Sequence, residues 1–485
     1  MKAEGASRVA TSDAVKSFDL IVIGGGPAGQ KAAVQGAKSG KRVLLVERGR
    51  SVGGACVRFG TIPSKTLRET ALALDKFKKL SGHVIELTLP EHLQVESLMT
   101  RKEEVIGSHE SYMQAQLARN GIEIWRGIAK FLGPHELEVA DVSGGKRLAR
   151  GEFLVIATGS SPRTPDDVPI DHEHLLDSDS ILSLSYLPES LTVLGAGVIA
   201  CEYAAIFAAL GCKVTVIDKA ASPLAFMDPE ITAHFTRQLE LFGGRFLGGQ
   251  KLERVAWDGL SRVETTLESG ELVRSEKLFC ALGRTAMVSG LALDNTGVKL
   301  SARGLVEVDQ HLRTAAPHIY AVGDVIGPPA LASTSMDQGR RAVCHAFGIE
   351  QGNLRDTTPV GIYTIPELGS VGLSEAEATL RYGGAVVGRA RFQEVARGQI
   401  SATTDGLLKL VTHPESGAVL GAHAAGENAA DLVHIGQMAI IAGMSFETFI
   451  DTIFNFPTYA EAYRIAALDV LGKRVAVATR ASAAE

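Results

Sequence analysis

The residues best suited to chemistry in this sequence are three glycines and the acid that follows them. Gly24, Gly26 and Gly29 come directly after the apolar run 18–23, and Glu47 ends the next apolar run. In this arrangement the first glycine permits a tight turn, the second lets the backbone approach a pyrophosphate, and the third allows close packing of a helix on a strand. The pyrophosphate then lies against N–H groups at the helix start, and the acid accepts hydrogen bonds from ribose hydroxyls. The segment is therefore predicted to bind a dinucleotide.

The same arrangement occurs again 171 residues later. Gly195 and Gly197 follow another apolar run, Ala200 replaces the third glycine, and Asp218 ends the next run. In both copies the acid follows the first glycine by 23 residues. A carboxylate at this place accepts from a ribose 2′-hydroxyl and repels a 2′-phosphate, which favours NAD(H) over NADP(H). Lys219 softens that discrimination in one interpretation and is a solvated surface charge in the other.

Buried strands must carry both turns, and the repeat includes the strand that closes each unit. The runs 154–159 and 278–283 each end in glycine, and another apolar run, 319–322, ends in Gly323-Asp324. Open parallel sheets bind their ligands at the carboxyl ends of strands, where these residues are expected. We predict an α/β fold with two Rossmann-like dinucleotide-binding domains, the second inserted in the first.

The chain changes in character from about residue 358. Strands are expected at 406–411 and 418–422, and apolar helices at 431–442 and 459–471, without a phosphate-binding loop. This pattern predicts a C-terminal α+β domain that is better suited to dimerisation than to binding a nucleotide.

Composition excludes several classes of function. The chain has 485 residues, of which 45% are hydrophobic and 21% charged, as in globular proteins of about three domains. A net charge of −6 gives no electrostatic reason to expect nucleic acid or an anionic membrane as a partner. No apolar run reaches the roughly 18 residues of a membrane span, and five cysteines without a CxxC pair argue against a disulfide framework or a zinc site. We expect a cytoplasmic protein without a metal, whose partners are small-molecule nucleotides.

Residues 53–65, with the sequence GGACVRFGTIPSK, lie between the two turns. They resemble the GG-x-C-x4-C-x-P-S-K pattern of the flavoprotein disulfide reductases with two dinucleotide-binding domains. The resemblance runs from about Phe18 to Lys473 and includes Ala157-Thr158-Gly159 and Gly323-Asp324. It implies FAD at the first turn, NAD(H) or NADP(H) at the second, and a homodimer joined through the C-terminal domain.

Two departures from that pattern argue against disulfide reduction. The second cysteine of the pattern is Thr61 here, and the histidine that acts as the base is Phe456. Thiol–disulfide exchange requires a thiolate relay and a base, which a hydroxyl and a phenyl ring do not supply. Cys56, which matches the outer cysteine, is interpreted as a small buried hydrophobic residue, with a redox role as the alternative.

The resemblance also assigns roles to single residues. It places Lys65 beside flavin N5 and pairs it with Glu202, so these two are the predicted catalytic residues, with an ordinary ion pair as the alternative. The predicted cofactor-binding residues are Gly24, Gly26, Gly29, Glu47, Cys56, Lys65, Ala129, Thr158, Gly159, Gly195, Gly197, Asp218, Gly283, Asp324 and Ala332. The predicted boundaries are a flexible tail at 1–17, an FAD-binding domain at 18–160 and 290–355, an NAD(P)-binding domain at 161–289 and a dimerisation domain at 356–485.

The segments GTIPSKTLRE at 60–69 and FNFPTYAEAYR at 454–464 narrow the resemblance to the Si-specific pyridine nucleotide transhydrogenases within that family. This implies hydride transfer between NADPH and NAD⁺ through flavin N5, which requires orientation and charge stabilisation but no thiol, acid or base. With one nicotinamide domain, the two nucleotides would use the same site in turn, by a ping-pong route. Asp218 argues against NADP(H), and two alternatives stay open. One is an NAD(P)H dehydrogenase that reduces a quinone, a dye or oxygen, and the other is a nucleotide-sensing component that acts through a partner protein.

Overall fold

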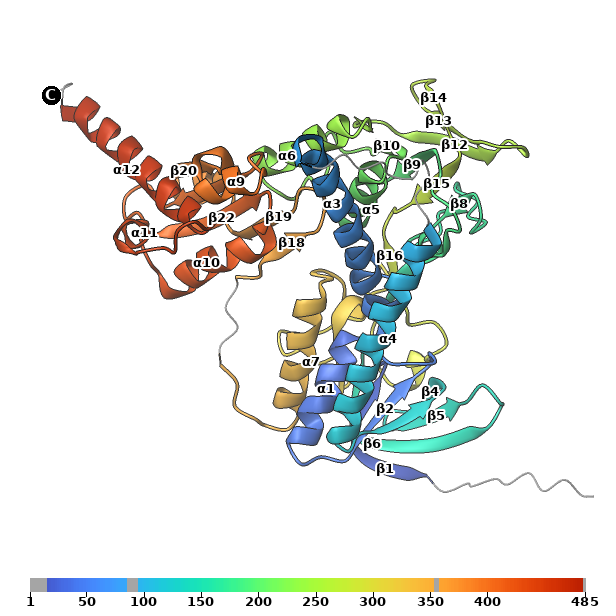
Figure 1. The fold of residues 1–485 in the computed structure, drawn as a ribbon. Coiled ribbons are helices and arrows are strands. Elements are labelled where there is room, and N and C mark those ends of the chain that lie inside the picture. The colour runs from blue at the N-terminus through green and yellow to red at the C-terminus, as the bar shows by residue number, and fades with distance from the viewer. Residues whose placement is uncertain (1–14, 85–94, 353–356, 483–485) are drawn as a thin grey trace, which may run out of the picture. The chain divides into compact units, whose positions relative to one another are not determined.

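The computed structural model describes residues 15–84, 95–352 and 357–482 (Figure 1). The chain forms two compact units. The first comprises Met1–Pro63, Glu103–Arg163 and Arg284–Gly352, and the second comprises Ser64–Lys102, Thr164–Gly283 and Asn353–Glu485. Most of the predicted tail, residues 1–14, lies outside the described residues, whereas Lys16 and Ser17 already belong to the first strand.

The first unit is built on a seven-stranded sheet with the strand order β3-β2-β1-β6-β5-β4, in which β17 also pairs with β6. Its parallel strands are β1 (Lys16–Ile23), β2 (Val43–Glu47), β3 (Glu123–Arg126), β6 (Lys146–Ile156) and β17 (Ile319–Ala321). The strands β4 (Ile128–Gly133) and β5 (Glu136–Ala140) are antiparallel. In the register of β1, Leu20 lies opposite Val43 on one side and Phe153 on the other.

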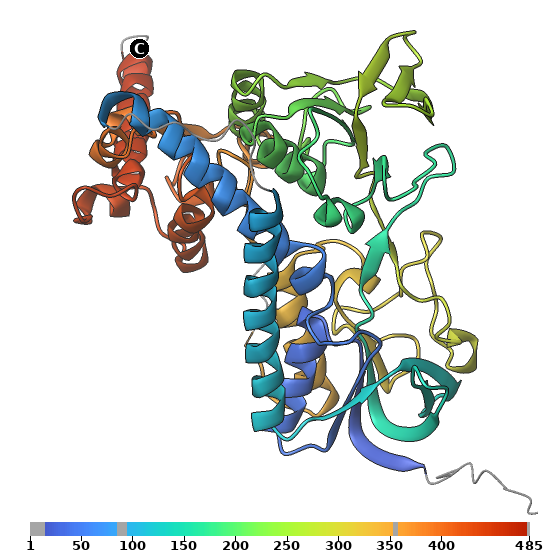
Figure 2. The same ribbon diagram turned by 45° about the vertical axis from the view of Figure 1, so that its right-hand side comes forward.

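Alternating side chains of β1 build two separate cores. Leu20 and Val22 belong to a core with residues of α1 (Pro27–Lys38), α7 (Ala332–Ala346) and the later turns of α4 (Val95–Arg119). The residues that alternate with them, Ile21 and Ile23, pack on the opposite face with β4 and β5. Successive side chains of a strand point to opposite faces, so both faces of this sheet are covered. Figures 1 and 2 show α1 and α7 side by side.

The second unit contains a five-stranded parallel sheet with the order β11-β10-β9-β15-β8. Its strands are β8 (Leu175–Leu176), β9 (Ser190–Leu194), β10 (Lys213–Ile217), β11 (Arg245–Leu247) and β15 (Lys277–Cys280). The helices α5 (Val198–Ala209) and α6 (Pro229–Leu241) share a core with one face of the sheet. Side chains of β12 (Leu252–Trp257), β13 (Val263–Leu267) and β14 (Leu272–Ser275) pack against the other face.

The same unit holds the C-terminal antiparallel sheet, with the order β18-β19-β22-β21-β20. Its strands are β18 (Val360–Ile362), β19 (Leu368–Gly372), β20 (Val386–Arg391), β21 (Leu407–Thr412) and β22 (Val419–Ala425). The helices α10 (Ala429–Ala442) and α12 (Glu461–Ser482) share its core. The last helix continues well past 471, where the sequence pattern placed its end, and residues 472–482 (GKRVAVATRAS) extend it without an apolar repeat of helical period.

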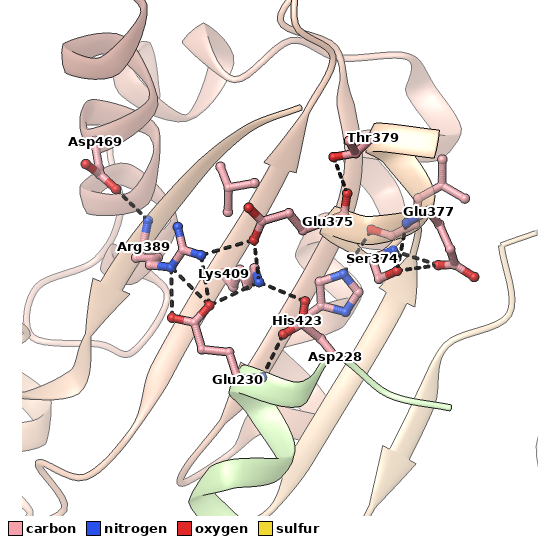
Figure 3. A network of polar contacts seen from close by, with 12 residues as sticks. Asp228, Glu230, Ser374, Glu375, Glu377, Thr379, Arg389, Lys409, His423 and Asp469 are labelled. Carbon is pink, nitrogen blue, oxygen red and sulfur yellow. Dashed lines mark hydrogen bonds and ion pairs between the residues drawn. The ribbon is translucent and has the colours of Figure 1, made fainter. Parts of the chain in front are cut away.

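A buried ion network joins α6 to this C-terminal sheet (Figure 3). The Lys409 ammonium lies 2.8 Å from Asp228, 3.0 Å from Glu230 and 2.7 Å from Glu375. Arg389 binds Glu230 through both Nε and Nη2. Asp228 is also the N-cap of α6, where its carboxylate accepts from the Glu230 N–H. Two cations thus hold three carboxylates, of which two lie at the start of α6 and the third, Glu375, begins α8 (Glu375–Tyr382).

Candidate functional site

The first glycine loop joins β1 to α1, and its backbone can be formed only by glycine at critical places. Gly24 has a φ of 104°, and a Cβ there would clash with the carbonyl oxygen of Ala157. A Cβ on Gly29 would clash in the same way with the Gly24 carbonyl oxygen. Gly26 differs, because the atom nearest to a Cβ added at this residue would be the Gly54 Cα, at 3.9 Å. The turn is thus closed toward the strand and open at Gly26.

The second loop, between β9 and α5, has the same backbone. Gly195 has a φ of 103°, and a Cβ there would lie 2.7 Å from the Ala281 carbonyl oxygen. Gly197, like Gly26, is the N-cap of its helix in an extended conformation, and a Cβ on it would meet nothing within 4 Å. Ala200 is fully buried at the third position. The predicted internal repeat therefore extends to the local geometry of both loops.

Each acid is bound to its own loop by two backbone N–H groups. Glu47 accepts from Gly25 at 2.7 Å and from Gly49 at 2.6 Å. Asp218 accepts from Ala196 at 2.7 Å and from Ala220 at 2.6 Å. These donors orient each carboxylate at the carboxyl end of its strand, where a ribose would lie.

The first loop fits a dinucleotide. No side chain caps the N-terminus of α1 and no acid lies in its first turn, so its unpaired N–H groups favour an anion. The hydroxyl oxygen of Thr158 is buried beside this loop and has no hydrogen-bond partner among the described residues. The N-terminus of α5 is likewise uncapped and free of acids in its first turn. Both loops therefore have the form that a pyrophosphate requires.

Other predicted contacts of the first loop lie in the same unit. Asp324, in a short 3-10 turn after β17, accepts from the Ser160 hydroxyl at 2.6 Å, and Ser160 in turn accepts from Arg284. Gly159 follows Thr158 with a φ of 72°. Ala332 is the first residue of α7.

Ala129 and Gly283 are less clearly placed for binding. Ala129 is buried in β4, two residues after Gly127, whose N–H binds the Glu47 carbonyl oxygen. Its side chain packs in the core, so any contact with a cofactor has to use its backbone. Gly283 is the last residue of the middle segment of the second unit, with a φ of 106° and open space where a Cβ would lie. The role of every predicted cofactor contact stays a prediction.

Lys65 and Glu202 are brought together within the second unit. Lys65 lies in α3 (Thr61–Val84), and its ammonium is 2.5 Å from a carboxylate oxygen of Glu202 in α5. The other oxygen of Glu202 accepts from the Tyr363 N–H at 2.9 Å. The Tyr363 ring centre lies 5.0 Å from the Lys65 nitrogen. The arrangement can hold one positive charge in a fixed place.

A second buried ion pair lies one helical turn farther along α3. Arg68 is 3.0 Å from Glu367, and its Nε donates to the Thr364 carbonyl oxygen at 3.1 Å. Burial raises the pKa of the Glu367 carboxyl, against the charge of Arg68, which lowers it. Sequence reasoning assigned no role to Arg68 or Tyr363, because both are recognisable only by contacts between segments that lie far apart in the chain.

The structure also defines the positions of Cys56, Thr61 and Phe456, the residues at which the sequence departs from the disulfide-reductase pattern or matches it only in part. Cys56 lies half-buried in the short helix α2 (Gly54–Arg58) and forms no disulfide. Thr61 is the first residue of α3, so it precedes Lys65 by one helical turn. Phe456 is 74% exposed. Within the described ranges, no helix is long and apolar enough to cross a bilayer, and no cluster of three or more His, Cys, Asp or Glu residues could hold a metal.

Comparisons with known families match nearly the whole chain. Residues 18–339 match the model of the pyridine nucleotide-disulphide oxidoreductases, and residues 358–467 match the dimerisation domain of the same family. A soluble pyridine nucleotide transhydrogenase of Mycobacterium bovis is 43% identical over 460 residues, which cover 95% of this chain and 98% of that protein. A protein of the same name from Hahella chejuensis is 40% identical and covers 94% of this chain and 98% of its own length.

Solved structures share the fold. The HOCl-induced flavoprotein disulfide reductase RclA from Escherichia coli matches with a TM-score of 0.84 and 27% identity, over 93% of this chain and 99% of that one. LpdA from Mycobacterium tuberculosis matches with a TM-score of 0.86 and 24% identity, over 94% and 99% of the two chains. The second likeness concerns the fold alone.

Proposed function

From the premise that this chain belongs to the pyridine nucleotide-disulphide oxidoreductase family, we propose that it transfers hydride between NADPH and NAD⁺ through bound FAD. Its cofactors are FAD, NAD(H) and NADP(H). The observation that carries the proposal is that both dinucleotide loops are intact while Thr61 stands where disulfide reductases of the family have their second cysteine. The names of the two transhydrogenase relatives support the same activity.

FAD, when bound, would supply the hydride chemistry, since a flavin can take up a hydride from one nicotinamide and give it to another. The residues of the chain would orient the two dinucleotides and stabilise the charge that develops during the transfer. Gly24, Gly26 and Gly29 would hold the FAD pyrophosphate on α1, with Glu47 at its ribose, and Gly195, Gly197 and Asp218 would do the same for NAD(H) or NADP(H) on α5.

Lys65 would contribute a fixed positive charge in this scheme. Glu202 keeps the ammonium in place through the 2.5 Å contact, and a preorganised charge stabilises negative charge that develops during hydride transfer. No residue has to move a proton, which agrees with Phe456 at the position of the base. One nicotinamide domain implies that the two nucleotides bind in turn, so initial-rate lines should be parallel.

An anaerobic half-reaction tests the proposal. The holoenzyme is reduced with one equivalent of NADPH, and NAD⁺ is then added. Rapid reoxidation of the flavin with matching formation of NADH is expected, and Lys65→Met should slow it. A flavin that stays reduced until a quinone or oxygen is admitted would overturn the proposal. That result would favour the alternative, an NAD(P)H dehydrogenase, to which Asp218 lends support because it favours NAD(H) over NADP(H).

We also propose a homodimer in the cytoplasm. The match of residues 358–467 to a dimerisation domain supports the dimer. Large apolar side chains of the C-terminal region, residues 357–482, are exposed, among them Met438, Ile453, Phe456, Leu468 and Val475. Light scattering should report twice the chain mass of 51.2 kDa, and a monomeric mass at micromolar concentration would contradict the dimer.

A further inference from the structure

We propose that Tyr363 is a positioning residue for Lys65, and that its main-chain N–H and its ring together hold the Lys65–Glu202 pair. The inference rests on the proposed function, which places the Lys65 ammonium beside the flavin. According to this inference, the segment that follows β18 in the C-terminal part of the chain determines the position of the Lys65 ammonium, which α3 carries.

The first contact acts through Glu202. The side chain of this carboxylate is only 6% exposed, and a buried carboxylate is costly unless both oxygens have partners. Oε2 binds the Lys65 ammonium, and Oε1 accepts from the Tyr363 N–H at 2.9 Å. The Tyr363 N–H therefore fixes the orientation of the Glu202 carboxylate, and Oε2 of this carboxylate in turn fixes the position of the Lys65 ammonium.

The second contact acts on the ammonium itself. The Tyr363 ring centre is 5.0 Å from Lys65 Nζ, within the roughly 6 Å at which a cation is attracted by an aromatic face. The Lys65 side chain is 25% exposed, so the attraction is only partly screened by water. Burial raises the pKa of the Tyr363 phenol, with Glu367, Asp431 and Glu202 adding to the effect, so the ring stays uncharged at neutral pH.

Tyr363 can hold Lys65 only because its own backbone is held. Arg68 donates to the carbonyl oxygen of the next residue, Thr364, and is anchored by Glu367. Arg68 follows Lys65 by three residues on the same helix, so one turn of α3 contacts both the ring of Tyr363 and the peptide that follows it. These contacts therefore fix the segment around Tyr363 relative to the turn of α3 that carries Lys65 and Arg68.

The test measures the midpoint potential of the flavin in holoenzyme variants. Tyr363→Leu keeps the main-chain N–H and removes the aromatic face. The Lys65 ammonium should then be held less firmly beside the flavin and should stabilise the reduced flavin less well. We expect a fall in the two-electron potential of about 30 mV, which corresponds to a tenfold change in the reduction equilibrium. Tyr363→Phe keeps the face and should retain the native potential. Tyr382→Leu, the same change at a more exposed site in the same domain, is the matched control.

Kinetics provide an independent readout. In Tyr363→Leu we expect kcat to fall with the potential while the KM for NADH stays within about twofold, because a positioning residue changes the reaction rather than nucleotide binding. Tyr363→Met serves as a second non-aromatic variant should Tyr363→Leu fail to retain FAD. A raised KM at an unchanged potential would assign Tyr363 to nucleotide binding and overturn the inference.

Lys65→Met separates the inference from the proposed function. A lowered potential in Lys65→Met with a native potential in both Tyr363→Leu and Tyr363→Met overturns the inference and leaves the role of Lys65 intact. An unchanged potential in Lys65→Met overturns the placement of Lys65 beside the flavin, and with it the inference. Absence of transhydrogenation in the native holoenzyme, with these potentials shifted as expected, overturns only the proposed reaction.

Discussion

Glu47 and Asp218 make the same pair of backbone contacts in their two loops, although Asp218 is one methylene shorter. One oxygen of each accepts at 2.7 Å from the residue after the first glycine, and the other accepts at 2.6 Å from the residue two positions beyond the acid. Each acid therefore belongs to the architecture of its loop as well as to the expected ribose site. A substitution therefore has to preserve the contacts of the acid with its loop if it is to reveal the contribution of the acid to ribose binding.

Asp218→Asn should change the nucleotide preference. The amide keeps one acceptor for the loop and removes the negative charge that repels a 2′-phosphate. We expect the ratio of the Kd for NADP⁺ to the Kd for NAD⁺ to fall by about tenfold, or about 1.4 kcal/mol. Titration calorimetry of the holoenzyme measures both constants. Glu47→Gln is the matched control in the other loop, and an equal change of the ratio in that variant would contradict the assignment.

Gly26→Ala and Gly197→Ala should separate cofactor binding from folding. A methyl group at Gly26 has 3.9 Å to its nearest neighbour, and one at Gly197 has open space, so both variants should fold. Each methyl group nevertheless occupies the space through which a pyrophosphate approaches the backbone. Gly26→Ala should lose FAD, and Gly197→Ala should retain FAD but bind NAD⁺ about tenfold more weakly.

The flavin absorbance per chain and the fluorescence of bound NADH distinguish these two outcomes. Gly24→Ala is a useful contrast, because its methyl group would meet the Ala157 carbonyl oxygen at a φ of 104°. That variant should fail to fold rather than fold without FAD. Full FAD content in Gly26→Ala would place the cofactor away from this loop.

Lys409→Met should strongly destabilise the second unit. The Lys409 side chain is 4% exposed, and its removal leaves Asp228, which is 3% exposed, without its cation. Breaking a buried pair in this way costs about 3–5 kcal/mol. Lys251→Met is the control, because Lys251 and Glu268 are both exposed and such pairs contribute about 1 kcal/mol or less. Urea unfolding followed by circular dichroism compares the free energies of unfolding of the two variants, and equal losses would show that the network stabilises the fold no more than an exposed ion pair does.

Acid should weaken the same network through Glu230. Hydrogen bonds from Arg389, and then Lys409, hold the pKa of Glu230 at about 2, below its ordinary value of 4.5. Because the folded-state pKa is the lower one, the ionised carboxylate stabilises the folded chain fully above about pH 4.5, and this stabilisation is lost as the pH falls toward 2. The stability difference between the native chain and Glu230→Gln should therefore be largest near neutral pH and shrink below about pH 4.5. A difference that stays constant over this range would contradict the prediction.

Much of the geometry of the two glycine loops could be predicted from sequence because its requirements are local. Gly24 and Gly195 adopt backbone conformations that other residues avoid, and the distance to Glu47 or Asp218 is set by one helix and one strand. Such features leave a pattern in a short segment of chain. The extent of α12 was predicted less well, because its last turns, residues 472–482, carry no apolar repeat of helical period from which their helical structure could be recognised.

The surroundings of the Lys65–Glu202 ion pair were decided by the tertiary structure alone. Lys65, Glu202 and Tyr363 come from three elements that are far apart in the sequence, and only the packing of α3 and α5 against the segment after β18 brings their atoms within contact. The Tyr363 contribution through a main-chain N–H is independent of its side chain and leaves no trace in residue type. The sequence by itself thus determined the local form of the two glycine loops, whereas long-range packing decided how the charge of Lys65 is held, because its partners come from distant segments that no local rule specifies.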